Sequence, residues 1–234
     1  MVQPFLHFKF YIIMGEAEII SSKGLLVIHS TFYFYGDAST PTLATQIASD
    51  IAQHWNEPAA TVRIHGNTYL LQFNITGIHQ PDLQPETVWY NDDPRLNYFR
   101  IEEFALGNIS FVDGLGSNTG YFKLENLLQT GTTAAHEYGH TLGLPHPNDL
   151  DIRGDSTPGI MYPRGTICDP AFQYNPAAQP ATPGGTLDPA HRRVLPSDIA
   201  LLKLEKLSFS TSGRARVGEF SSLYHEKHQA PTAV

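Results

Sequence analysis

The chain has 234 residues, of which 41% are hydrophobic and 11% aromatic, so it can bury a sizeable core. Its formal net charge is -8, and no basic cluster exceeds a pair such as Arg192-Arg193, which argues against nucleic acid or an anionic membrane as a partner. No run approaches the about 20 apolar residues of a membrane span. The single cysteine, Cys168, cannot form an internal disulfide, and we interpret it as a small loop residue. We expect a globular monomer with no membrane or nucleic-acid partner.

Residues 1–23 form an N-terminal segment that differs from a signal peptide. Lys9 interrupts its apolar run, and no small-residue cleavage site follows. The pattern over residues 8–20 favours a strand. Residues 25–35 are rich in β-branched and aromatic side chains and predict a buried strand. Extended structure is therefore expected near the start of the chain.

A helix is predicted directly after this strand. Thr40 is a suitable capping residue, and Pro41 suits the first helical position. Asn56 and Pro58 end the pattern. Four large apolar side chains recur along one face of this helix: Leu43, Ile47, Ile51 and Trp55. We expect about four helical turns that cover a sheet.

Short strands follow the helix. They are predicted at residues 61–64, 69–75, 98–104 and 108–112. The first two flank a turn at residues 65–67, and the proline-rich residues 80–98 predict a surface loop. Strand, helix and strand in this order fit an open mixed sheet with a backing helix.

The segment from His136 to His146 carries three histidines, a glutamate and a glycine. If residues 134–142 are helical, His136 and His140 lie one turn apart on one face, so both imidazoles can reach one metal ion. Gly143 then allows a positive φ that ends the helix and lets His146 return as a third ligand. Three imidazoles with an open fourth position are typical of catalytic zinc. Cobalt or nickel would also accept three imidazoles in vitro.

Glu137 follows the first histidine by about 100° of helical rotation, so its carboxylate lies beside the metal and can hold a water molecule. Thr132 or Thr133 can cap this helix. The alternative is an amphipathic core helix that happens to carry histidines. The five fixed positions of the motif make that coincidence rare.

The spacing HExxHxxGxxH at residues 136–146, followed by Gly159-Ile160-Met161-Tyr162-Pro163, resembles the signature of the metzincin metallopeptidases. The Met-Tyr-Pro sequence is most similar to the matrixin branch. The resemblance implies zinc at the histidines and an apolar floor formed beneath them by Met161. In astacins and serralysins a tyrosine two residues after the methionine can touch the metal, and Pro163 at that position predicts no tyrosine ligand.

The implied fold is α+β and metzincin-like. A mixed twisted sheet with a backing helix and an active-site helix lies above a smaller irregular C-terminal subdomain that ends in a helix. The predicted divisions are the N-terminal segment 1–23, the catalytic domain 24–207 with subdomains 24–143 and 144–207, and the flexible tail 208–234. Pro196-Ser197-Asp198 opens the predicted last helix.

The resemblance also points to the substrate cleft. In metzincins an antiparallel edge strand just before the zinc helix pairs with substrate backbone, and residues 118–124 are the candidate. The alternative is an ordinary hairpin whose glycines serve only the turn. The segment after the methionine, residues 162–166, is expected to wall the pocket for the residue that follows the scissile bond. The candidate cleft residues are Asn118, Gly120, Tyr121 and Tyr162.

A polar loop at residues 147–158 carries Asp149, Asp151 and Asp155, which could bind Ca²⁺ through their oxygens. Their spacing matches no EF-hand, so a solvated loop is the other interpretation. One of these carboxylates could instead accept the second ring N–H of a zinc histidine.

We therefore predict a secreted, zinc-dependent endopeptidase that acts on polypeptides, with Glu137 as general base and then general acid. One alternative is a zinc-binding module without turnover, for which zinc without hydrolysis of any protein would be the sign. The other is a toxin or virulence factor specific for one protein, which would cleave a single protein in a lysate.

Overall fold

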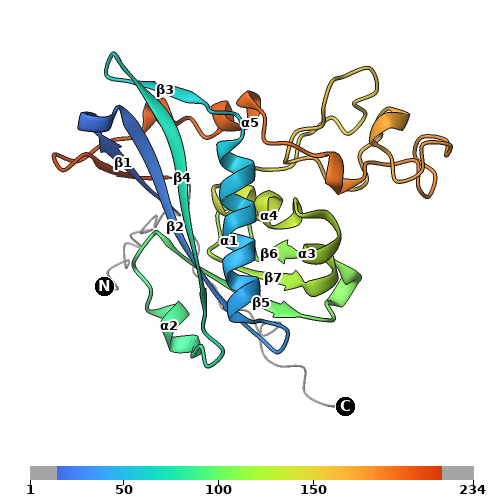
Figure 1. Cartoon of the computed structure of the whole chain (residues 1–234), viewed down its shortest axis with the longest axis horizontal. Coiled ribbons are helices and arrows are strands. Elements are labelled where there is room, and N and C mark those ends of the chain that lie inside the picture. The colour runs from blue at the N-terminus through green and yellow to red at the C-terminus, as the bar shows by residue number, and fades with distance from the viewer. Residues whose placement is uncertain (1–14, 218–234) are drawn as a thin grey trace, which may run out of the picture.

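The computed structural model describes residues 15–217, which form a mixed α+β structure built on a twisted sheet (Figure 1). Within this range eight strands form the sheet: β1 (Glu16–Ile20), β2 (Leu25–Tyr35), β3 (Thr61–Ile64), β4 (Asn67–His79), β5 (Leu96–Glu102), β6 (Phe111–Val112), β7 (Thr119–Lys123) and β8 (Arg214–Arg216). The strand order is β3-β4-β2-β5-β7-β6, and β1 pairs with both β2 and β8.

The helices lie mostly between these strands in the sequence. They are α1 (Pro41–Asn56), α2 (Pro85–Trp89), α3 (Leu124–Thr130), α4 (Thr133–Thr141) and α5 (Pro196–Leu201). Short 3-10 turns are η1 (Ser21–Lys23), η2 (Leu106–Asn108), η3 (Pro170–Phe172), η4 (Pro189–His191) and η5 (Leu204–Lys206). Among the described residues, no helix has the length and apolar character needed to cross a membrane.

Strand β2 is the centre of the sheet, with the bounds that the sequence predicts. One of its edges pairs in parallel with β4, while its other edge is shared by β1, antiparallel, and β5, parallel. Burial alternates along most of β2, so one face of the strand packs in the core while the other is only partly covered. The apolar side chains with at most 1% exposure are Leu26, Ile28, Phe32 and Phe34.

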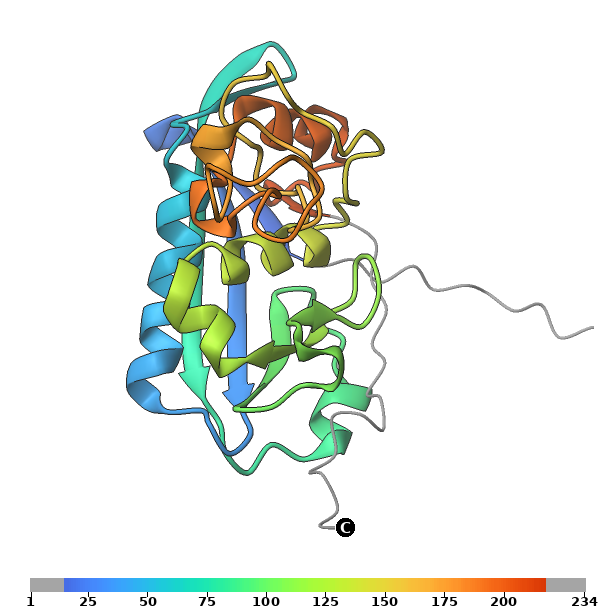
Figure 2. The same cartoon turned by 90° about the vertical axis from the view of Figure 1, so that its right-hand side faces the viewer.

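Helix α1 backs the sheet, as the sequence predicts, and Figure 2 shows it along one face of β2 and β4. Thr40 Oγ1 accepts a hydrogen bond from Leu43 N at 3.1 Å, which caps the first turn. The helix approaches β4 closely at Gly77, where an added Cβ would lie 2.1 Å from Ala44 O. Only glycine allows this contact between helix and strand.

Three sequence predictions are wrong in position. The expected loop at 80–98 contains helix α2, and β5 already begins at Leu96. The expected strand at 108–112 is reduced to the two residues of β6. The expected edge strand at 118–124 is β7, which lies between β5 and β6, so the sheet ends at β6 instead. The last of these differences concerns strand order, which is decided by long-range pairing and not by local pattern.

The predicted flexible tail 208–234 also needs correction in its described part. Residues Arg214–Arg216 form β8, which pairs antiparallel with β1, and Val217 N donates to Gly15 O at 3.1 Å. Ala215 and Val217 are buried in the main core. Residues 1–14 and 218–234, which include most of the predicted strand at 8–20, lie outside the described residues.

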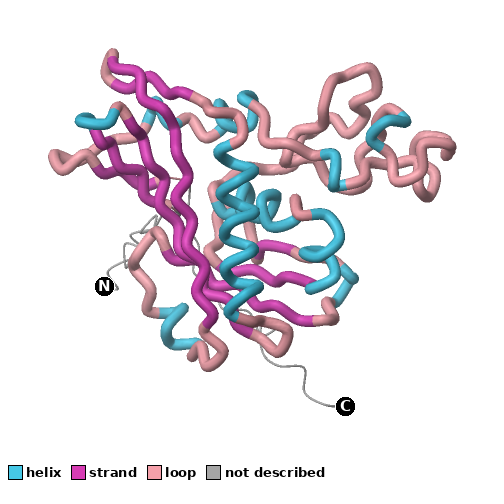
Figure 3. The backbone as a smooth tube through the Cα atoms, in the orientation of Figure 1, coloured by secondary structure: helices cyan, strands magenta, loops and turns pink. Residues whose placement is uncertain are grey.

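Residues 144–207 are largely irregular, as the sequence predicts, and Figure 3 shows loops through most of this part. It has a small core of Ile152, Cys168 and Leu187, in which Cys168 is a free, fully buried thiol. The predicted last helix is α5, which buries Ile199 and begins with Pro196. Figure 2 shows α4 between this irregular part and strands β5–β7, so α4 separates the two regions.

Candidate metal centre

Helix α4 brings three histidines together. His136 Nε2 and His140 Nε2 each lie 3.1 Å from His146 Nε2, and one ligand atom from each ring falls within 4.8 Å of the others. The first two histidines are one helical turn apart, and Gly143, with φ 85°, turns the chain so that His146 comes back. Each step in this arrangement follows from the local spacing of the motif.

Helix α4 itself is fixed by one contact with α1 and one with β2. Trp55 Nε1, on α1, donates to Ala135 O at 3.0 Å, and the Tyr138 hydroxyl lies 2.8 Å from Ser30 Oγ on β2. Both aromatic side chains are fully buried. Thr132 precedes the helix but its side chain does not cap it, since it donates to Pro189 O at 2.7 Å instead.

The ring tautomers of two histidines are fixed by backbone carbonyls. His136 Nδ1 lies 2.7 Å from Ile160 O, and His140 Nδ1 lies 2.7 Å from Leu144 O. Because a carbonyl only accepts, both Nδ1 atoms carry the proton, and both Nε2 atoms present lone pairs. The Nε2 atoms of His136 and His140 therefore face His146 Nε2 as acceptors, the form in which an imidazole binds a metal ion. Three neutral imidazoles also form the donor set that zinc takes in catalytic sites, so the residues fit this metal.

Burial keeps the three imidazoles neutral. It lowers the pKa of His136 well below its ordinary value and that of His140 to about 4, and it also lowers the pKa of His146. The positive charge of Arg192 adds to the effect on all three. Neutral imidazole is the form that binds a metal ion.

The aspartates of the 147–158 loop do not take part in this centre. Asp151 forms an ion pair with Arg153, and Asp149 accepts a hydrogen bond from the Asp151 backbone. The expectation that one of these carboxylates orients His136 or His140 is wrong, because carbonyls do so. Among the described residues, the histidine group is the one cluster of three or more suitable side chains.

Glu137 is buried beside the histidines. Burial raises the pKa of its carboxyl to about 7, an effect opposed by the positive charge of Arg192 and by a hydrogen bond from the Val112 backbone. Since Val112 belongs to β6, the end strand of the sheet holds the Glu137 side chain. The carboxylate is thus oriented independently of the three imidazoles.

The segment after residue 158 passes against α4. Met161 is 1% exposed, and an added Cβ on Gly139 would lie 2.3 Å from Met161 Sδ. Asp198 Oδ2, at the start of α5, accepts from Leu195 N at 2.8 Å and from Ile160 N at 3.3 Å. Asp198 therefore holds Ile160, whose carbonyl orients His136.

A cavity of about 450 Å³ opens at the histidines. It is lined by Ile109, Ser110, Phe111, Val112, Asn126, Thr133, His136, Glu137, His140, His146, Pro163, Arg164, Gly165 and Arg192. The expected walls at residues 162–166 are present in part, through residues 163–165. The other cleft candidates do not line it: Asn118, Gly120 and Tyr121 are buried in or beside β7, and the Tyr162 side chain packs on the small core of the irregular part.

Sequence reasoning missed two groups of cavity residues. The first is residues 109–112, of which Phe111 and Val112 form β6 and take the edge position expected for residues 118–124. The second is Arg192, which the sequence offers only as half of a basic pair. No local spacing connects Arg192 to the histidine motif, because it arrives from a distant irregular segment.

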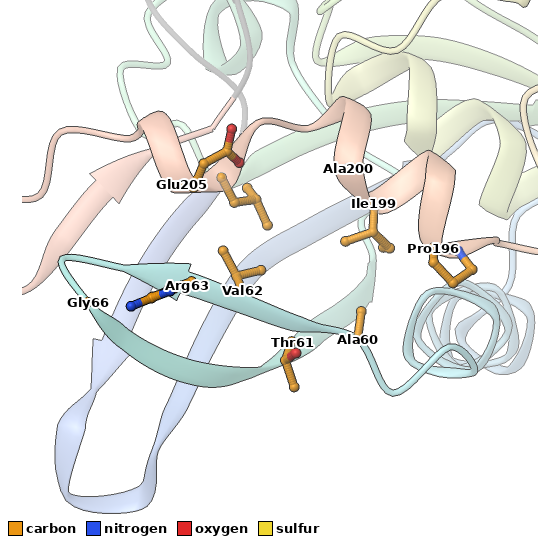
Figure 4. A pocket seen from close by; sticks show the side chains of 10 residues that line it. Ala60, Thr61, Val62, Arg63, Gly66, Pro196, Ile199, Ala200 and Glu205 are labelled. Atoms are coloured by element: carbon orange, nitrogen blue, oxygen red, sulfur yellow. The ribbon is translucent and has the colours of Figure 1, made fainter.

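A larger hollow, of about 900 Å³, lies elsewhere, between the β3–β4 hairpin and the segment that contains α5 (Figure 4). Its walls include Val62, Ile199 and the charged Arg63 and Glu205. None of the three histidines lines it, and neither does Glu137. The larger hollow therefore lacks the residues of the candidate metal centre. The chemistry of the lining residues favours the smaller cavity as the functional site.

No family model matches this chain, and no curated protein matches it. Among solved structures, the structure of myroilysin aligns with 82% of this chain and 100% of that chain, at 14% sequence identity and a TM-score of 0.36. A similarity of this size shows neither the fold nor the activity of this chain. The described residues themselves form a three-histidine group, suited to a metal ion, in a mixed α+β chain.

Proposed function

We propose that this chain is a zinc-dependent endopeptidase of the metzincin type. The observation that carries the proposal is the convergence of the three Nε2 atoms at a cavity that also contains Glu137. His136, His140 and His146 would hold the zinc. When bound, zinc would polarise the scissile carbonyl and lower the pKa of a water molecule to about 7.

Glu137 is the general base and then the general acid. Its carboxylate, oriented by the Val112 backbone, takes the proton of the attacking water and delivers it to the departing amine nitrogen. The Nδ1–H groups of His136 and His140 keep donating to the carbonyls of Ile160 and Leu144, so both rings keep their orientation during this transfer.

Strand β6 supports an extended polypeptide as the substrate. It stands at the end of the strand order, and Phe111 and Val112 line the cavity together with Glu137. A peptide that adds beside a sheet edge is held by main-chain hydrogen bonds, whatever its side chains are. This arrangement favours cleavage within a chain.

The test is the substitution Glu137→Gln, which keeps the shape of the side chain and removes its basicity. We expect kcat/KM for a quenched-fluorescent peptide to fall about a hundredfold to ten-thousandfold, the usual range for loss of a general acid–base group. Zinc content, measured by mass spectrometry, should stay the same because the histidines are unchanged.

The matched control is Glu205→Gln, an equal charge change in the other hollow. It should leave both hydrolysis and zinc content at wild-type values. Hydrolysis by Glu137→Gln within a few-fold of wild type would refute the role of Glu137.

A further inference from the structure

We propose that Arg192 binds a carboxylate of the substrate inside the cavity. This rests on the proposed function and adds a preference for anionic groups near the scissile bond. Two sources would present that chemistry: an aspartate or glutamate side chain, or the terminal carboxylate of a peptide.

Arg192 is buried in the wall of the cavity. Its side chain lines the same cavity as the histidines and Glu137, yet the residue is only 4% exposed. Arginine is rarely buried to this extent without an ionic partner. Burial lowers the pKa of the guanidinium to about 10, which still leaves it charged at neutral pH.

The hydrogen bonds of Arg192 leave part of its guanidinium available. Nε and Nη2 both donate to one atom, Thr132 Oγ1, at 3.3 and 3.1 Å, and Nη1 donates to Tyr162 O at 3.1 Å. A guanidinium has five N–H groups, so one on each terminal nitrogen keeps no partner among the described residues. No described carboxylate comes within ion-pair distance of it either.

The charged side chains that line the cavity have an excess of positive charge. Its lining contains two arginines, Arg164 and Arg192, and one acidic residue, Glu137, whose carboxylate is committed to proton transfer. A carboxylate can accept two parallel hydrogen bonds from a guanidinium, which adds direction to the charge attraction. A carboxylate is therefore the ligand that suits the unpaired N–H groups.

A purely structural role for Arg192 makes a different prediction. Its bonds join Thr132, before α4, to Tyr162, after Met161, so its loss would lower stability in either case. A structural role, however, gives no reason to distinguish aspartate from asparagine in a substrate. Discrimination between these two side chains is therefore the decisive readout.

The experiment uses one quenched-fluorescent peptide with aspartate or asparagine on either side of the cleaved bond, and a short form with a free or amidated C-terminus. The full chain is compared with Arg192→Gln, Arg192→Lys and the control Arg193→Gln, an adjacent arginine outside the cavity lining. Binding of each peptide to the Glu137→Gln protein, with and without the same arginine substitutions, is measured by fluorescence anisotropy.

We expect wild type to favour one of the anionic forms about tenfold or more, as charge-assisted hydrogen bonds allow. Arg192→Gln should bring the ratio near one, while Arg193→Gln should keep it. If Arg192→Gln does not fold, Arg192→Lys decides, because it keeps the charge but loses the paired donors, and its ratio should fall.

A wild-type ratio near one for all three comparisons would overturn the proposal, as would an unchanged preference after either Arg192 substitution. An aspartate preference identifies a side-chain carboxylate, and a free-terminus preference identifies the terminal one. If no peptide is cleaved, the proposed function fails, and the binding comparison still decides whether Arg192 selects a carboxylate.

Discussion

At the scale of single residues, the metal centre depends on which nitrogen of each histidine carries the proton. Sequence spacing gives the three rings and Glu137, because HExxHxxGxxH is a local pattern on one helix and one turn. It does not give the partners of the Nδ1 atoms. The acceptors are the carbonyls of Ile160 and Leu144, and a carbonyl leaves no mark in the sequence.

Gly139 offers a test at this scale. An added Cβ would lie 2.3 Å from Met161 Sδ and 3.3 Å from a ring atom of buried Trp55, so Gly139→Ala must displace Met161. We expect the free energy of unfolding to fall by about 1–3 kcal/mol, the usual cost of overpacking a core. Zinc affinity should also fall, because Ile160, next to Met161, orients His136.

Urea unfolding and competition with a zinc-binding dye measure the two effects of Gly139→Ala. The matched control is Gly114→Ala, where an added Cβ meets nothing within 4 Å. It should change neither quantity. Equal stability of the two variants would mean that Met161 does not pack against α4 in this way.

At the scale of elements, local pattern predicts β2, α1 and α5 but not the order of the strands. Strand β2 and helix α1 carry period and capping signals of their own, and both have the predicted bounds. Which of β6 and β7 reaches the edge depends on pairing with β5, and a two-residue strand has no period to detect. The position of Arg192 could not be predicted for a related reason. The residue lies outside the helices and strands, so no periodic pattern in the sequence places it at the cavity.

Asp198 connects α5 to the metal centre and gives a prediction on pH. Burial raises the pKa of its carboxyl above the ordinary 3.8, against the opposing effect of the Leu195 and Ile160 N–H groups. The folded state therefore holds this proton more tightly than the unfolded state. The contribution of Asp198 to stability is largest below pH 3.8 and is lost as the pH rises through the higher folded value.

Asp198→Asn removes this titration but keeps an oxygen in the position that accepts both N–H groups. The free energy of unfolding of wild type minus that of Asp198→Asn should therefore decrease as the pH rises from 3.8, in urea titrations at a series of pH values. Asp198→Ala, which loses both hydrogen bonds, should cost about 1–3 kcal/mol at low pH and less as the pH rises. A difference that grows with pH would contradict the raised pKa.

At the scale of the whole molecule, distant parts of the chain meet at α4. Strand β8 pairs with β1, so residues near the end of the described chain add a strand to the sheet. Their polar sequence, with few apolar residues, predicts a flexible tail. Three residues pair there because β1 offers an edge, which sequence pattern cannot reveal. The irregular part from 144 onward supplies Pro163, Arg164, Gly165 and Arg192 to the cavity, while the sheet supplies β6.

Peptide hydrolysis by the purified chain of known zinc content, before and after removal of the metal with a chelator, tests whether the three histidines and Glu137 form a zinc peptidase. We expect one zinc ion per chain, cleavage that stops when zinc is removed, and recovery when zinc is restored, because three neutral imidazoles converge beside Glu137. A protein that binds no zinc, or that cleaves peptides equally well without it, would contradict the proposed function.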